Sequence, residues 1–253
     1  MRRLQTTPCA AQSWRRPLTR SRSYGSARVP TIVTVGTTRV MPAALVDIDG
    51  TLVDSNYHHA LCWFRAFREH ELIVPIWRLH RHVGMGGDKY VAAVCNEDVE
   101  ARLGDSLRAR WEELFDTVIN EVEPLAGARQ LVVDLKARGH AVVVASSSIE
   151  RHLDVNLDKL RIRELVDGWT TKDDVEQSKP EPDLVAAAMA KAGTQDAVMI
   201  GDSPWDITAA RTAGIATLAV LSGGFGRSEL AGALAIYDSV DELRARLDDS
   251  PLR

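Results

Sequence analysis

The sequence predicts a doubly wound, Rossmann-like α/β fold, in which helices cover both faces of a parallel sheet. Short unbroken runs of Val, Ile, Leu and Ala recur along the chain, helix-like segments separate them, and glycine or polar residues end them. Strands that are buried on both faces consist of such unbroken runs. Strands that alternate with helices form parallel βαβ units, so both observations indicate the same architecture.

Four apolar runs are the expected strands, and helix-like segments precede two of them. The strands are expected at Ala43–Asp47, His140–Ser146, Ala197–Asp202 and Thr217–Leu221. The helices are expected at Gln130–Arg138, before the second strand, and at Asp183–Ala192, before the third. The Gly50–Thr51 break directly after the first run favours a strand that ends in a loop. Near the C-terminus, Ser239 and Glu242 match the capping-box pattern and predict a last helix through Leu247.

The segment between the first two strands is about 90 residues long, far more than a simple crossover requires. Its apolar residues recur at helical spacing in two groups, Tyr57, Ala60, Phe64 and Phe67, and Leu103, Leu107, Trp111, Leu114 and Val118. We therefore predict a small helical cap domain at residues 57–123, inserted after the first strand of a core domain that comprises residues 41–56 and 124–253. Within the insert, Arg78–Lys89 contains three glycines and several cations and is expected to be a loop.

The composition excludes several classes of protein. Hydrophobic residues make up 45% and charged residues 26% of the 253 residues, as in an ordinary globular protein. No run approaches the roughly 18 apolar residues of a membrane span, so no membrane partner is expected. Cys9, Cys62 and Cys95 are odd in number and lack metal-ligand spacing, which argues against disulfides or a zinc site and favours a reducing, cytoplasmic location. No feature of the sequence indicates an oligomeric state.

Residues 1–40 differ from the rest of the chain. They contain eight arginines and no acidic residue, so the formal charge of −4 for the whole chain leaves −12 for residues 41–253. We do not expect such an acidic body to bind nucleic acid. The basic head either is an organelle transit peptide or lies upstream of a misassigned start, and Met41, directly before the first patterned segment, favours the second interpretation. Because the head lacks apolar periodicity, it is expected to be disordered.

Two carboxylates follow the first predicted strand, at the edge where open parallel sheets bind ligands. Asp47 and Asp49 are separated by one residue. Carboxylates so close repel each other unless a cation neutralises them or one holds a proton. Magnesium is the natural cation, because it prefers hard oxygen ligands. Gly50 and Thr51 let the chain turn and present N–H groups to an anion. The alternative is a surface turn whose aspartates cap a helix.

Two further acids follow the third predicted strand. Asp202 ends that strand, and parallel pairing would bring it beside Asp47 to complete an oxygen-rich metal pocket. Asp206 lies four residues later, behind Pro204. It either belongs to the pocket, or occupies the first turn of a helix, where the macrodipole favours acids, or does both.

A lysine and a serine complete the set of candidate residues. Lys179 lies in Ser-Lys-Pro-Glu-Pro-Asp, where the prolines restrict the loop. A fixed ammonium would offset negative charge on Asp47 and on an incoming phosphoryl group, although isolated lysines are usually solvated. Ser146, at the end of the second strand, would hydrogen-bond a phosphate oxygen with help from the N–H of Ser147. Alternatively, Ser146 or one of the next two serines caps the following helix.

In this order, the four signals resemble the motifs of the haloacid dehalogenase superfamily. They are similar specifically to its phosphatase-like members with a helical cap after the first strand, of the phosphoglycolate phosphatase and β-phosphoglucomutase type. The resemblance runs from about Ala43 to Leu247. The motifs are matched by Asp47-Ile48-Asp49-Gly50-Thr51-Leu52, by Ser146, by Lys179 in Lys-Pro-Glu-Pro, and by Gly201-Asp202-Ser203-Pro204-Trp205-Asp206.

The resemblance implies catalytic roles for the first motif. Asp47 would attack phosphorus and form an aspartyl-phosphate intermediate. Asp49 would protonate the leaving oxygen and then deprotonate the attacking water. Family members that cleave carbon–halogen bonds have no second acid at this position, so Asp49 indicates phosphoester chemistry.

The resemblance also implies the surroundings of the nucleophile. Mg²⁺ would be held by the carboxylates of Asp47 and Asp202 and by the main-chain carbonyl of Asp49. Ser146, Ser147 and Lys179 would bind the phosphate, with Asp206 behind them as a supporting residue.

In such proteins the cap closes over the site and contacts the substrate. Arg81 and Lys89 are candidates for binding a second anionic group, unless they are simply solvated. His58 and His59, at the start of the cap, either border the site or pack within the helix.

The resemblance favours a Mg²⁺-dependent phosphatase that acts on a small phosphorylated molecule, such as phosphoglycolate or a sugar phosphate. One alternative is a phosphosugar mutase, an isomerase that uses the same nucleophile. Another is a non-catalytic binding protein on this scaffold, which the complete set of competent motif residues disfavours.

Overall fold

The computed structural model describes residues 41–253, so the predicted head at residues 1–40, with Cys9, lies outside the described residues. Six strands form one parallel sheet in the order β3-β2-β1-β4-β5-β6. The strands are β1 Ala43–Val46, β2 Val142–Ala145, β3 Gly168–Thr170, β4 Ala197–Gly201, β5 Ala216–Val220 and β6 Ala235–Tyr237. The four predicted strands are all present, each within two residues of its expected start and end.

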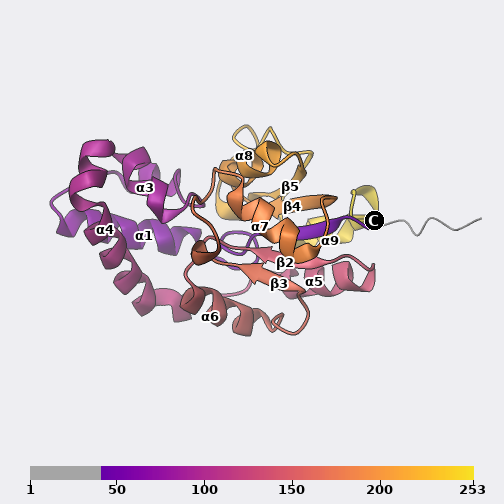
Figure 1. Cartoon of the computed structure of the whole chain (residues 1–253). Coiled ribbons are helices and arrows are strands. Elements are labelled where there is room, and N and C mark those ends of the chain that lie inside the picture. The colour runs from indigo at the N-terminus through magenta and orange to yellow at the C-terminus, as the bar shows by residue number, and fades with distance from the viewer. Residues whose placement is uncertain (1–40) are drawn as a thin grey trace, which may run out of the picture. The chain divides into compact units, whose positions relative to one another are not determined.

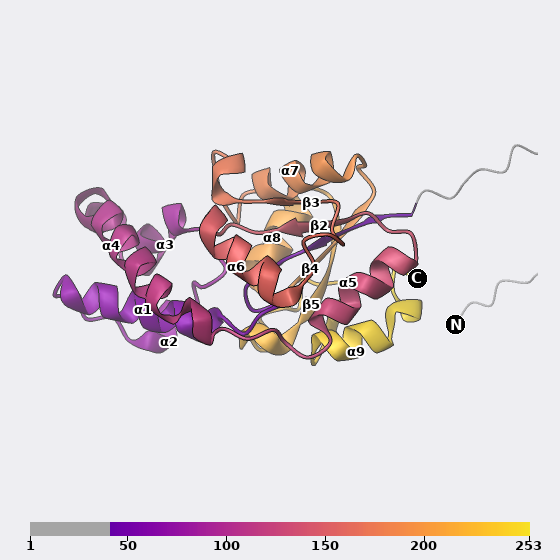
Figure 2. The ribbon, with the colours of Figure 1, turned by 90° about the horizontal axis from the view of Figure 1, so that it is seen from below.

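Helices cover both faces of the sheet, which confirms the doubly wound fold (Figures 1 and 2). The helices that follow the insert are α5 Ala128–Ala137, α6 Glu150–Leu160, α7 Asp183–Ala192, α8 Pro204–Thr212 and α9 Val240–Ala245. Ala44 and Val46 of β1 pack in one cluster with leucines of α5, α6 and α9. Ala43 and Leu45 pack in another cluster with α7 and α8. Adjacent residues of β1 therefore face opposite layers of the core, as strand geometry requires.

The chain between β1 and β2 is helical. It forms α1 Asn56–Glu69, α2 Ile76–His80, α3 Gly87–Val94 and α4 Glu97–Val118, followed by the 3₁₀ turn Ile119–Glu121. Helix α1 packs against α2 and α4, and α3 packs against α4, so these helices lie together beside the sheet (Figures 1 and 2). The two segments that connect them to the sheet run side by side, since the N–H of Leu125 donates to Leu52 O and the N–H of Asp54 donates to Glu123 O, both at 2.9 Å.

The elements differ from the sequence-based expectations in a few places. The stretch Arg78–Lys89 is not one loop, because its first three residues belong to α2 and its last three to α3. Gly86 occupies the N-cap position of α3 in an extended conformation, a position where glycine is well tolerated. The strands β3 and β6, which have three residues each and lie at the two edges of the sheet, were not among the expected strands. Strand β3 (Gly-Trp-Thr) is not an apolar run, whereas β6 lies in the unbroken apolar run of residues 233–237, which could have been recognised.

The predicted last helix is present as α9, and it ends at Ala245, two residues before the expected Leu247. The hydroxyl of Ser239 accepts from the N–H of Glu242 at 3.1 Å, as the capping pattern predicts. The carboxylate of Glu242, however, accepts from the N–H of Asp238 at 2.6 Å, so the box is not closed on Ser239. Among the described residues, no helix combines the length and the apolar character needed to cross a membrane. Cys62 and Cys95 are free thiols.

Candidate active site

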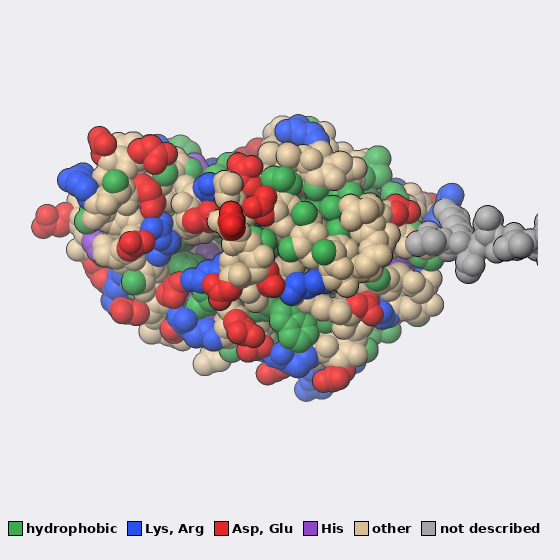
Figure 3. Space-filling model, in the orientation of Figure 1, with side chains coloured by type: hydrophobic (Ala, Val, Ile, Leu, Met, Phe, Trp, Pro, Cys, Tyr) green, Lys and Arg blue, Asp and Glu red, His purple; other side chains and the backbone are tan. Residues whose placement is uncertain are grey.

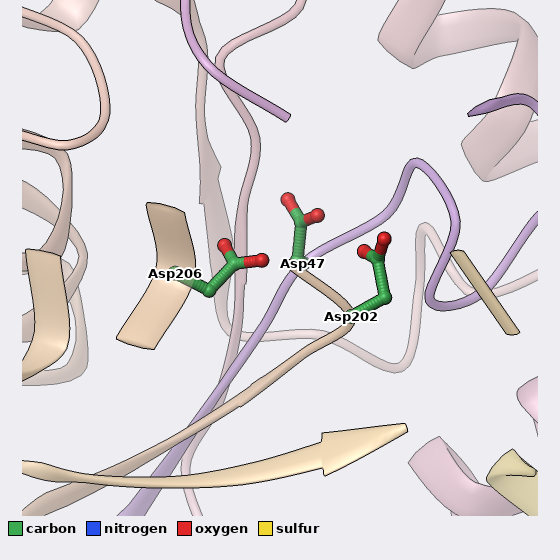
Figure 4. A group of neighbouring side chains, drawn as sticks. All are labelled: Asp47, Asp202 and Asp206. Carbon is green, nitrogen blue, oxygen red and sulfur yellow. The ribbon is translucent and has the colours of Figure 1, made fainter. Parts of the chain in front are cut away.

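Parallel pairing of β1 with β4 brings two predicted acids together. Val46 lies opposite Ile200 in the register, and the N–H of Asp47 donates to Ile200 O at 2.9 Å. Asp202 follows β4 one residue later and so lies beside Asp47. Asp206, in the first turn of α8, is the third member of the group (Figure 4). One carboxylate oxygen from each of the three acids lies within 4.8 Å of the others, and all three residues are at most 4% exposed.

Lys179 supplies a positive charge to this carboxylate group. Its Nζ donates to Asp47 Oδ1 at 2.7 Å and forms an ion pair with Asp206 Oδ1 at 2.7 Å. The side chain is 1% exposed. Burial opposes the charged form, but the carboxylates of Asp206 and Asp47 hold the pKa of Lys179 above its ordinary value, so the ammonium stays charged. Three buried carboxylates thus face one buried cation.

The pKa values of the carboxylates reflect their burial and the excess negative charge of the group. Burial raises the pKa of Asp47 to about 7, because the opposing effect of Lys179 is weaker and Asp206 adds to the increase. Burial, Asp206 and Asp47 raise the pKa of Asp202 well above its ordinary value. A carboxyl group whose pKa is raised in this way favours a proton or another cation as a neighbour.

Hydrogen bonds from the loop after β1 and from α1 orient Asp202. Thr51 Oγ1 donates to Asp202 Oδ1 at 2.9 Å, and Asn56 Nδ2 donates to Asp202 Oδ2 at 2.8 Å. Asn56 Nδ2 also donates to Gly223 O at 3.1 Å. Gly223 approaches so closely that a Cβ there would lie 1.7 Å from Asp202 Oδ2. Asn56 and Gly223 are not predictable from the sequence, because neither carries a motif signal.

Asp206 both caps a helix and pairs with the lysine. Its Oδ2 accepts from the N–H and the hydroxyl of Ser203, at 3.1 and 2.6 Å, and closes a capping box at the start of α8. Pro204 occupies the first turn, as expected. The other oxygen faces Lys179. Asp206 therefore combines the two alternatives that the sequence left open.

Asp49 turns toward α1 and the loop after β2. Its Oδ1 accepts from Ser55 Oγ at 2.7 Å and lies 3.1 Å from His59 Nε2, and its Oδ2 accepts from Ser148 Oγ at 2.7 Å. Burial alone would raise the pKa of Asp49, but His59 and the two hydroxyl donors hold it below its ordinary value. His59 is buried and stacks on Phe115 with ring centroids 4.0 Å apart. Of the two candidate histidines in the first turn of α1, His59 is thus the one that borders the site.

The serines after β2 adopt a local turn before α6. Ser146 is buried, and its Oγ accepts from the N–H of Ser148 at 3.0 Å. Helix α6 begins at Glu150 with Ile149 at its N-cap, so the alternative in which one of the serines caps the helix is wrong. The strand end places Ser146 and Ser147 directly before Ser148, which contacts Asp49.

The two residues between β1 and β2 that the sequence suggested for binding an anion have protein partners in this structure. Arg81 Nε lies 3.2 Å from Glu229 Oε1, and Lys89 Nζ donates to Gln177 Oε1 at 3.1 Å. The glycine-rich segment instead contacts the loop that carries Lys179: the N–H of Gly86 donates to Lys179 O at 3.2 Å. A Cβ at Gly86 would lie 1.6 Å from the hydroxyl of the residue before Lys179, which explains the glycine there.

Comparisons with known proteins agree with this arrangement. The profile of the haloacid dehalogenase-like hydrolase family matches residues 44–220. Pyrophosphatase PpaX from Bacillus cereus (strain Q1) is 27% identical over 194 residues, which cover 70% of this chain and 81% of that protein. A hydrolase from Pseudomonas syringae superposes with a TM-score of 0.78 and 30% identity, over 83% of this chain and 99% of that one. β-Phosphoglucomutase from Clostridium difficile superposes with a TM-score of 0.73 over 84% of this chain and 97% of that one, and its 17% identity indicates similarity of fold alone.

The close approach of Gly223 to Asp202 predicts the effect of an added methyl group. Gly223→Ala should lower the free energy of unfolding in urea by about 1–3 kcal/mol, because the new Cβ displaces the Asp202 carboxylate and the Asn56 amide. Gly168→Ala is the control, since its Cβ would meet only Lys191, at 3.8 Å, and should change stability by less than about 0.5 kcal/mol. Equal effects of the two substitutions would contradict the contact at Asp202.

Proposed function

Because the chain belongs to the haloacid dehalogenase-like hydrolase family, we propose that it hydrolyses small phosphate monoesters through a covalent intermediate on Asp47. The observation that carries this proposal is the buried pair of Asp47 and Lys179 at the end of the central strand, beside two further carboxylates. The relatives named as a pyrophosphatase and a hydrolase support chemistry at phosphorus and hydrolysis.

In the proposed first step, a carboxylate oxygen of Asp47 attacks phosphorus and the bond from phosphorus to the ester oxygen breaks. The leaving oxygen takes a proton from Asp49. In the second step, water attacks the phosphorus of the aspartyl phosphate, Asp49 accepts a proton from that water, and inorganic phosphate leaves with Asp47 restored. Asp49 needs a proton for the first step and none for the second, and His59, 3.1 Å away, is the neighbour that can exchange one with it.

The charge balance of the site fits a divalent cation. Three buried carboxylates and one ammonium leave an excess of negative charge, and the oxygen donors are those that Mg²⁺ prefers. Asp47, Asp202 and the main-chain carbonyl of Asp49 would hold the ion. We do not place Asp206 among the ligands of the ion, because one of its oxygens contacts the Lys179 ammonium and the other accepts from Ser203. When bound, the ion would neutralise charge on the phosphoryl group and on the nucleophile.

The phosphate itself would be held by the residues around Asp47. Lys179 offers a charge that is fixed in place by two carboxylates, so it needs no reorganisation when the phosphoryl group arrives. Ser146 and the N–H of Ser147 are proposed as donors to the phosphate oxygens. The mutase alternative differs only in the acceptor of the phosphoryl group, and the fold similarity to β-phosphoglucomutase does not favour it. Isomerisation of a hexose phosphate without phosphate release would select the mutase.

Replacement of the nucleophile tests this proposal. Asp47→Asn should lower kcat for phosphate release from p-nitrophenyl phosphate by on the order of 10³-fold or more, because the amide cannot form the intermediate. The melting temperature should stay the same or rise, since one of three mutually repelling carboxylates is removed. Asp54→Asn, at an exposed position in the same loop, is the matched control and should keep its activity. Substantial turnover by Asp47→Asn would exclude Asp47 as the nucleophile.

Proton competition predicts how magnesium stabilises the protein. The pKa of Asp47 is about 7 and that of Asp202 is also raised, so protons compete increasingly with the ion for these carboxylates as the pH falls. The increase in melting temperature on adding Mg²⁺ should therefore be small at pH 5.5 and larger at pH 8. Each increase compares samples with and without Mg²⁺ at the same pH, so the titration of groups outside the site affects both samples equally. Asp202→Asn should lose the increase, and an equal increase at both pH values would contradict this assignment of the ligands.

A further inference from the structure

A cavity of about 290 Å³ lies between the insert helices and two loops of the sheet domain. On the insert side it is lined by the start of α3 and by α4, and on the other side by residues 147–149 and 172–178. Ser148, in its wall, donates to Asp49 Oδ2, and Ser178, also in its wall, directly precedes Lys179. The cavity thus adjoins Asp49, the group that protonates the leaving alcohol in the proposed mechanism, so we place the alcohol part of the ester there.

The charged groups of the cavity wall are predominantly acidic. The four acids are Asp88, Glu112, Asp173 and Glu176, and the two bases are Arg108 and Lys172. In Figure 3, acidic and basic side chains lie side by side on the surface between the regions of α4 and of the segment before α7. The formal charge of the wall is therefore −2.

Both bases of the wall already have acidic partners. Arg108 Nη1 lies 2.8 Å from Glu100 Oε1 and Arg108 Nη2 lies 2.7 Å from Asp105 Oδ1. Lys172 Nζ lies 3.0 Å from Glu112 Oε1. A second anionic group on the substrate would therefore meet an acidic wall whose cations are occupied. Arg81 and Lys89, the candidates that the sequence offered for binding such a group, line other hollows of the surface.

The rest of the wall is apolar or polar without charge. Trp111, Ile149 and Val175 supply the apolar part, and Trp111 is held by stacking on Trp63 with ring centroids 5.1 Å apart. Ser147 and the acids supply hydrogen-bond partners, and carboxylates accept hydrogen bonds from hydroxyl and ammonium groups. A volume of about 290 Å³ is at the small end of ligand sites, and suits a leaving group no larger than a monosaccharide.

From this wall we infer that the substrate is a phosphate monoester whose alcohol carries hydroxyl or ammonium groups and no second anion. The inference rests on the proposed function and adds the class of leaving group. It separates this chain from a hydrolase of pyrophosphate, phosphoglycolate or sugar bisphosphates, in all of which the leaving group is anionic. The two excess negative charges of the wall lie several ångströms from the leaving group in a partly solvated cavity. They should make kcat/KM for an ester with a neutral or cationic leaving group about tenfold higher than for one with an anionic leaving group.

The test compares kcat/KM, with Mg²⁺ present, for two pairs of esters matched in size. Ethanolamine phosphate is paired with phosphoglycolate, and glycerol 3-phosphate is paired with 3-phosphoglycerate. The ethanolamine and glycerol esters should exceed their carboxylate partners by about tenfold or more at low ionic strength, and the difference should shrink at high salt. The double variant Asp173→Asn/Glu176→Gln should reduce the difference. The control Glu164→Gln/Asp196→Asn, which removes two exposed acids outside the cavity wall, should leave it unchanged.

The outcomes separate this inference from the proposed function. Equal or faster hydrolysis of the carboxylate esters would overturn the inference and leave the phosphatase proposal intact. Hydrolysis of p-nitrophenyl phosphate without hydrolysis of the ethanolamine or glycerol ester would overturn it as well. Failure to hydrolyse any of these five esters would instead count against the phosphatase proposal, and the inference would fall with it.

Discussion

The ion pairs of Lys179 with Asp47 and Asp206 are the interactions on which the rest of the site depends. Burying three carboxylates together is unfavourable, and one fixed ammonium compensates only part of their repulsion. The remaining imbalance raises the pKa of Asp47 and of Asp202 and makes the pocket receptive to a cation. The capping box at the start of α8 and the donors to Asp202 serve the same purpose, because they hold these charges in one arrangement.

The topology explains why this imbalance arises where it does. Strand β1 pairs with β2 on one side and with β4 on the other, so the chain order reverses at β1. Loops after adjacent strands diverge at such a point and leave room for a ligand at the carboxyl edge of the sheet. Asp47 follows β1 and Asp202 follows β4, while the serines follow β2. The insert helices add His59 and the cavity wall of α4 to the same edge.

Much of the core and several neighbours in the site could be predicted from the sequence, because buried strands and motif residues leave local signals. The four central strands are apolar runs. The edge strand β3 (Gly-Trp-Thr) lacks that signal, and β6 has only three residues, although it lies in the apolar run of residues 233–237. The sequence also led to the grouping of Asp47, Asp202, Asp206 and Lys179, since parallel strands end at one edge. Asn56 and Gly223 could not be found in this way, because their contacts with Asp202 join segments far apart in the chain. The start of α3 could not be predicted, because the glycines there are compatible with an N-cap as well as with a loop.

The central claim is that Asp47 carries the phosphoryl group during turnover. The most direct measurement is reductive trapping: the enzyme is mixed with Mg²⁺ and substrate, quenched, and treated with borohydride, which reduces an aspartyl phosphate to homoserine. Peptide mass spectrometry then locates the reduced residue. The account predicts homoserine at position 47 in samples that contain substrate, and unmodified Asp47 in samples without it. Trapping at another residue during active phosphate release would contradict the account.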